Sequence, residues 1–208
     1  MAITRCWSDG VYLPEVFPKF YKLHIQIVLR LSHWIGDALT LINNKNGLNS
    51  LQNKKTYLLV ALHSDISKFL SILPQQQELV LKSLRTSIVQ QKPQQLTVVK
   101  DSVGKSFDDL NETLSTHLNK IQQSLIDSLI LDCGAENIKQ VNDLPRLYRK
   151  TNRDVPTRCS SYVDQMLKPL KSFKVEYESK LGKEVVTKVF ECVLTKITSK
   201  YVFFDIYT

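Results

Sequence analysis

The chain has 208 residues, of which 43% are hydrophobic and 23% are charged, and this composition excludes a disordered polyampholyte. Six glycines and seven prolines are too few for a collagen-like chain or a loop-rich β-sandwich. The net charge of +8 favours acidic partners or anionic membrane surfaces and gives no information about the fold.

Neither a membrane-spanning helix nor a signal peptide is expected. Uncharged runs are no longer than nine residues, as in Thr56–Ser64, whereas a spanning helix needs about 20 mainly apolar residues. Asp9 and Glu15 interrupt the stretch in which a signal peptide would have its apolar core. We therefore expect a cytosolic chain.

The first part of the chain predicts three helices. Between Val16 and Ile42, apolar residues recur in steps of three and four, which is the helical period. The predicted buried stripe of this helix is Phe20, Leu23, Ile27, Leu31, Trp34 and Ala38. Thr56–Leu73 predicts a second helix, which we expect Pro74 to end, and a third helix is expected to restart there and run to Pro93.

The strongest pattern in the sequence is an eleven-residue repeat in which apolar residues follow steps of three, four and four. Its members are Leu96, Val99, Val103, Phe107, Leu110, Leu114, Leu118, Ile121, Leu125 and Leu129. Such a repeat, at about 3.67 residues per turn, predicts a nearly straight or slightly right-handed stripe. The helix that carries it would be about 50 Å long at ~1.5 Å per residue, which favours a rod-like bundle.

The remainder of the chain predicts a break around Gly134, a short helix over Tyr162–Leu170 and a last helix over Val175–Tyr201. No β-strand signal of comparable strength occurs. We therefore predict an all-α fold, in which residues 1–208 form a single domain built as an elongated antiparallel helical bundle.

No catalytic, cofactor or metal site is predicted. No histidine is followed by a second histidine four residues on, so the HExxH pattern is absent, and no CxxC pair occurs. The sequence Gly104-Lys105-Ser106 is similar to the end of a phosphate-binding loop, but Val99 stands where the motif requires its first glycine. We therefore expect a protein that is not an enzyme.

The densest group of basic residues lies around Pro145 and Pro156. The candidate partner-docking residues there are Arg146, Tyr148, Arg149, Lys150, Asn152, Arg153 and Arg158. Two interpretations stay open. The segment is either a solvated loop whose arginines cap helix C-termini, or a docking loop for an acidic protein segment or anionic lipid, at ~1 kcal/mol per basic residue near a membrane. Nucleic-acid binding is not expected, because no known binding module is present.

Two segments carry a more specific signal. The first is Arg5-Cys6-Trp7-Ser8-Asp9, followed by Tyr12-Leu13-Pro14. The second runs through Pro145–Asn152, Val155–Thr157, Ser160–Asp164 and Leu167–Leu170. Together they resemble the C-terminal region of the family formed by subunit 2 of the conserved oligomeric Golgi complex.

This resemblance implies the helical-rod fold of multisubunit tethering complexes. It also implies a role without catalysis in retrograde intra-Golgi vesicle transport and Golgi organisation, which supports the localisation of glycosylation enzymes. The implied partners are other subunits of that complex, SNAREs, Rab GTPases and golgins, with peripheral contact to the anionic cytoplasmic face of the Golgi membrane. Family members are longer, so the chain resembles a fragment of one. The alternative is a free-standing basic helical adaptor that binds anionic membranes or RNA.

Overall fold

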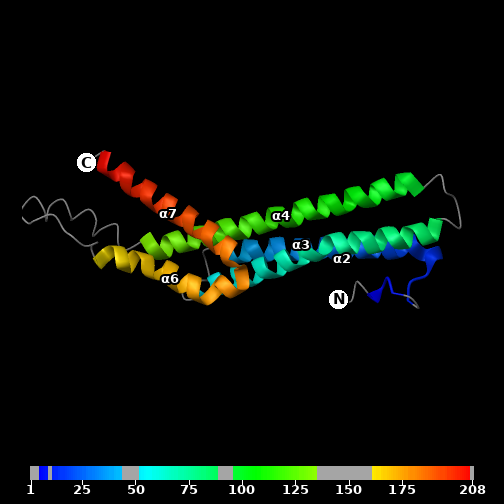
Figure 1. Ribbon diagram of the computed structural model, residues 1–208, viewed down its shortest axis with the longest axis horizontal. Helices are drawn as coiled ribbons and strands as arrows, with labels where there is room; N and C mark the ends of the chain where they lie inside the picture. The colour runs from blue at the N-terminus through cyan, green and yellow to red at the C-terminus, as the bar shows by residue number, and fades with distance from the viewer. Residues whose placement is uncertain (1–4, 9–10, 44–51, 89–95, 135–160, 207–208) are drawn as a thin grey trace, which may run out of the picture. The chain divides into compact units, whose positions relative to one another are not determined.

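The computed structural model describes residues 5–8, 11–43, 52–88, 96–134 and 161–206, and every regular element within these ranges is a helix (Figure 1). The all-α prediction is therefore confirmed. In chain order the elements are the short 3-10 helix η1 (Pro14–Val16), α2 (Phe17–Asn43), α3 (Gln52–Ile88), α4 (Leu96–Gly134), α6 (Ser161–Leu181) and α7 (Lys183–Ile206).

The helices contribute to two compact units. Unit 1 comprises Met1–Ser50 and Leu62–Ile121, and unit 2 comprises Leu51–Ala61 and Gln122–Thr208. Unit 1 therefore contains α2, most of α3 and the first part of α4, whereas unit 2 contains the start of α3, the end of α4, and α6 and α7.

Within unit 1, α3 runs antiparallel to α2. The Tyr12 hydroxyl, which precedes α2, donates a hydrogen bond of 2.9 Å to the carbonyl of Ser83 near the end of α3, and it also bonds the Ser87 hydroxyl. The start of α2 therefore lies beside the end of α3. These contacts tie the chain before α2 to a residue about 70 positions later, so they stabilise tertiary rather than local structure.

In contrast, α4 runs parallel to α2 in unit 1. The rings of His24 and Phe107 have centroids 5.7 Å apart, and farther along both helices His117 Nε2 lies 3.1 Å from the Ser32 hydroxyl. Because both residue numbers increase from the first contact to the second, the two helices share one direction. A Cβ atom at Gly36 would touch the His117 ring at 3.4 Å, so the small residue allows close approach there.

The eleven-residue stripe on α4 is buried as predicted. Of the nine members whose side chains the structure describes, Val99 and Leu118 are half-buried and the other seven are buried. The buried members are Val103, Phe107, Leu110, Leu114, Ile121, Leu125 and Leu129. Burial of side chains of this size contributes roughly 1.5–3 kcal/mol each, so this stripe is a principal source of stability for α4.

The stripe predicted for α2 is wrong by one position. Leu23, Ile27, Leu31 and Trp34 are exposed, and Trp34 is 77% exposed. The buried residues are instead Phe17, His24, Val28, Ser32, Ile35, Leu39 and Ile42. Polar His24 and Ser32 interrupt the true core stripe in the sequence, whereas the neighbouring stripe is apolar throughout. The helix therefore carries two apolar faces, of which one stays exposed.

The predicted break at Pro74 is also wrong, because α3 continues from Gln52 to Ile88 with Pro74 inside it. An interior proline removes one backbone hydrogen bond and costs about 3 kcal/mol. Pro74 is itself exposed, while Phe69, Leu73 and Val80 on either side are buried. Packing of these side chains offsets the cost and keeps the helix continuous.

The helical hairpin of unit 2 turns at Gly182. The sequence predicts a break between Leu170 and Val175, but α6 continues through Pro169 to Leu181. Gly182 has a φ of +85°, in the left-handed region, and its N–H donates a hydrogen bond of 2.9 Å to the carbonyl of Glu178. This is the usual end of a helix in a glycine cap, and it sets α7 beside α6.

Replacing Gly182 with alanine should lower the free energy of unfolding by about 1–2 kcal/mol, since a side chain is strained at this φ although the space around it is open. Replacing Gly104, which lies inside α4 with equally open space, should raise it by about 0.5–1 kcal/mol. Urea unfolding of both variants measures the difference. If both variants changed the free energy of unfolding in the same direction, the positive φ assigned to Gly182 would be contradicted.

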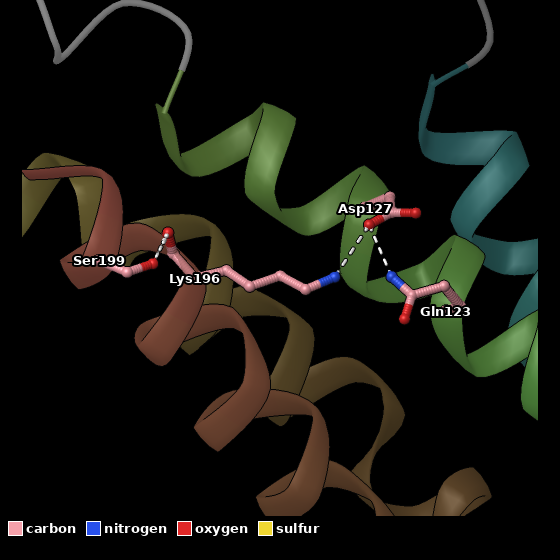
Figure 2. A network of polar contacts seen from close by, with 4 residues as sticks. All are labelled: Gln123, Asp127, Lys196 and Ser199. Atoms are coloured by element: carbon pink, nitrogen blue, oxygen red, sulfur yellow. Dashed lines mark hydrogen bonds and ion pairs between the residues drawn. The ribbon is translucent and has the colours of Figure 1, made fainter. Parts of the chain in front are cut away.

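A polar network joins α7 to the end of α4 in unit 2. The Lys196 ammonium lies 3.4 Å from Asp127 Oδ1, which also accepts a hydrogen bond of 2.8 Å from the Gln123 amide; the dashed lines in Figure 2 mark both contacts. Both partners of the ion pair are about half exposed, so the pair contributes at most about 1 kcal/mol. The apolar contacts of the hairpin, such as Phe173 with Phe190, hold unit 2 together more strongly.

Two stretches, Pro14–Asn43 and Lys54–Ser87, are long and apolar enough to cross a bilayer by length and composition alone. The run-length argument does not detect these stretches, because isolated charges break the uncharged runs without lowering the average hydropathy enough, and length and composition alone do not show that either helix spans a membrane. Core helices of soluble proteins meet the same threshold, and both stretches contain core side chains such as Val28 and Leu84.

Candidate functional site

The predicted docking residues fall outside the part of the chain that the structure describes. Arg146, Tyr148, Arg149, Lys150, Asn152, Arg153 and Arg158 all lie within residues 135–160. The choice between a docking loop and a solvated, helix-capping loop therefore stays a prediction.

The buried titratable side chains favour their neutral forms. Burial lowers the pKa of His24 to about 4, and it also lowers the pKa values of His63 and His117. Burial raises the pKa of the Cys133 thiol to about 11 and that of Tyr177 to about 12. These shifts favour the uncharged form of each side chain at neutral pH.

Metal-ligating residues are not clustered in the described ranges. Among these residues, no group of three or more histidine, cysteine, aspartate or glutamate side chains could hold a metal ion. His24 and His117 are packed against neighbouring side chains and hydrogen-bonded.

The first of the two specific sequence segments forms an aromatic anchor against α2. Trp7 is buried, and its indole N–H donates a hydrogen bond of 3.2 Å to His24 Nδ1. Three further rings have centroids 5.4–6.2 Å from that of Trp7, and they belong to Tyr12, Phe17 and Phe20. The segment therefore holds the N-terminal residues against unit 1 and has a structural explanation.

Acidification should destabilise unit 1 through His24. Its pKa is about 4 when folded and about 6.5 when unfolded, so protonation favours the unfolded chain. The stabilisation is complete above about pH 6.5 and is lost as the pH falls toward 4, by no more than about 3 kcal/mol. The measurement is urea unfolding at pH 7.5 and pH 4.5, for the chain and for His24→Gln.

The comparison of the two chains isolates His24 from the other buried histidines. The His24→Gln variant should be less stable at pH 7.5 and should lose less stability on acidification. An equal loss in both chains would show that His24 is not the group responsible.

An apolar groove lies between α2 and α3 in unit 1. It has a volume of about 790 Å³, and Leu114 of α4 contributes to its lining. One wall consists of Leu31, Trp34, Ile35, Asp37, Ala38 and Leu41 from α2, and the other of Leu62, Asp65, Ile66, Lys68, Phe69 and Ile72 from α3. Sequence reasoning missed this groove because it assigned the α2 wall to the core.

Comparison with known proteins identifies extensive similarity. The family described as "COG complex component, COG2, C-terminal" matches residues 1–205. The chain is 52% identical to "Conserved oligomeric Golgi complex subunit 2" of Drosophila melanogaster over 200 residues, which cover 96% of the chain and 27% of that protein. No solved structure matches.

More distant relatives carry the same printed name. The chain is 26% identical to the Homo sapiens protein over 96% of the chain and 30% of that protein. It is 27% identical to the Arabidopsis thaliana protein over 82% of the chain and 22% of that protein. The chain thus spans less than a third of the length of these curated relatives.

Proposed function

The chain belongs to the family of the C-terminal region of subunit 2 of the conserved oligomeric Golgi complex, and on this premise we propose that it acts as part of a Golgi vesicle-tethering subunit. The family match over residues 1–205 carries the proposal, and the 52% identity to the Drosophila relative supports it. The proposed role is without catalysis, and the relatives' printed name, a subunit of a complex, supports it.

The proposed cellular role is retrograde intra-Golgi vesicle transport and Golgi organisation, with support for the localisation of the glycosylation machinery. The proposed partners are other subunits of the complex, together with SNAREs, Rab GTPases and golgins. The protein would lie on the cytoplasmic face of the Golgi membrane, in peripheral contact with its anionic surface. Tethering requires a stiff body, and the packing of the α4 stripe within unit 1, with Val103, Phe107 and Leu114 buried, supports this role.

Microscopy of the fluorescently tagged chain in living cells tests this proposal. The chain should concentrate at the Golgi and should disperse when the rest of the complex is depleted. A uniform cytosolic distribution that is insensitive to depletion would contradict the proposal. A distribution that followed anionic lipid or RNA without the complex would favour the free-standing adaptor, which no observation now favours.

The basic segment Arg146–Arg158 is proposed as the docking surface for an acidic segment of a partner protein. Reversing the charge at Arg149, Lys150 and Arg153 should abolish recovery of the partner subunits and leave the melting temperature unchanged. The matched control reverses three exposed lysines outside the segment, Lys100, Lys105 and Lys174. A lowered melting temperature with partner binding retained would instead show that the segment braces neighbouring helices.

A further inference from the structure

The exposed face of α2 has the pattern of a helix-packing surface. Its apolar residues recur in steps of three and four over about five turns, and they are Leu23, Ile27, Leu31, Trp34, Ala38 and Leu41. Isolated exposed apolar residues are ordinary, but a contiguous row that borders a groove marks an interaction site. The C-terminal half of this row forms one wall of the apolar groove in unit 1.

Three helices surround this groove. The antiparallel pair α2 and α3 forms its walls, and α4 contributes Leu114. A groove between antiparallel helices is the place where a further helix completes a four-helix bundle, because its side chains can pack between both walls. The lining is apolar apart from Asp37, Asp65 and Lys68, which is the composition that an amphipathic helix matches.

The charged residues of the groove define the chemistry of its occupant. Asp37 comes from the α2 wall and Asp65 from the α3 wall, so carboxylates face the groove from both sides. Lys68 follows one helical turn after Asp65. Basic side chains on an incoming helix would complement the two carboxylates, and an acidic side chain would complement Lys68.

We propose that this groove binds one amphipathic helix of another protein, which carries apolar residues in steps of three and four and a lysine or arginine that pairs with Asp37 or Asp65. The two carboxylates would repel anionic lipid headgroups, so a membrane surface is disfavoured as the occupant. The proposal extends the proposed function, since a tethering subunit must bind partners, but it depends only on the groove.

A photo-crosslinking residue in place of Trp34 tests the occupant directly. Trp34 is 77% exposed, so its replacement should not affect folding. The control places the same residue at Val175, which is 87% exposed on α6 and far from the groove in sequence. The full chain is expressed in cells, irradiated and purified, and the crosslinked peptide is sequenced by mass spectrometry.

The expected adduct at position 34 is a segment of another protein with the apolar spacing and the basic residue described above, and it should be absent at position 175. When the crosslinking residue at position 34 is combined with Asp37→Lys and Asp65→Lys, the yield of the adduct should fall at least tenfold. This corresponds to about 1.4 kcal/mol of lost binding free energy. The melting temperature should not change.

The remaining results would overturn the proposal. They are an adduct with a second copy, with another segment of the same chain or with lipid, an adduct peptide that lacks the pattern, a yield that charge reversal does not change, or no adduct at all. A chain that reaches the Golgi and binds the complex while its groove gives no such adduct would leave the proposed function intact.

Discussion

Replacing Phe107 with alanine should lower the free energy of unfolding by about 3–5 kcal/mol, the largest effect expected of a single truncation in α4. The side chain is 2% exposed, belongs to the eleven-residue stripe and lies against the His24 ring. Its removal leaves a cavity between α4 and α2 that close-packed neighbours cannot fill. For a chain of this size, the melting temperature should fall by roughly 10 °C.

Urea unfolding followed by circular dichroism measures the change at Phe107. Val98→Ala is the matched control, because Val98 lies on the same helix and is 71% exposed. That control should stay within about 0.5 kcal/mol of the unmodified chain. Equal effects at Phe107 and Val98 would mean that the stripe does not face the core.

Replacing Trp7 with alanine should cost about 3 kcal/mol or more, although the residue lies outside the long helices. Its indole is 7% exposed and contacts the rings of Tyr12, Phe17 and Phe20. The substitution removes these contacts and also the N–H that His24 accepts.

The variant Trp7→Phe separates the two contributions. It retains an aromatic ring but loses the hydrogen bond to His24 and the volume of the pyrrole ring, so it should cost about 1–2 kcal/mol, less than Trp7→Ala. Urea unfolding at pH 7.5 measures both variants. If Trp7→Ala were as stable as the unmodified chain, the N-terminal segment would not be anchored to α2.

The fold was predictable wherever one apolar period dominated its helix. The α4 stripe has no competing pattern, so its buried residues could be identified from spacing alone. On α2, two apolar stripes compete, and the core contains His24 and Ser32 because Trp7 and His117 supply hydrogen-bond partners from elsewhere in the chain. The periodicity of a single helix does not identify hydrogen-bond partners that come from other segments of the chain.

The predictions of helix ends were wrong for a related reason. Pro74 and Pro169 are local signals for a break, but both helices continue through them, with buried side chains on both sides of Pro74 and directly after Pro169. The break that does occur is at Gly182, where glycine accepts a φ that other residues avoid. A proline inside a helix lowers its local stability, and tertiary packing determines whether the helix stays continuous there.

Of the two candidate binding surfaces, one was predicted from the sequence and the other was not. The basic segment around Arg149 was identified from charge density, and its role stays a prediction. The apolar groove was missed because Trp34 and Leu31 were assigned to the core, although their spacing was read correctly. Periodicity identifies a packing face but does not say whether that face is covered by the same chain or by a partner.

The most direct test of the central claim is quantitative mass spectrometry of proteins that co-purify with the tagged chain from cells. If the chain is part of a Golgi tethering subunit, other subunits of the conserved oligomeric Golgi complex should be enriched over a purification with the tag alone. Recovery of the folded chain without any of those subunits would contradict the account.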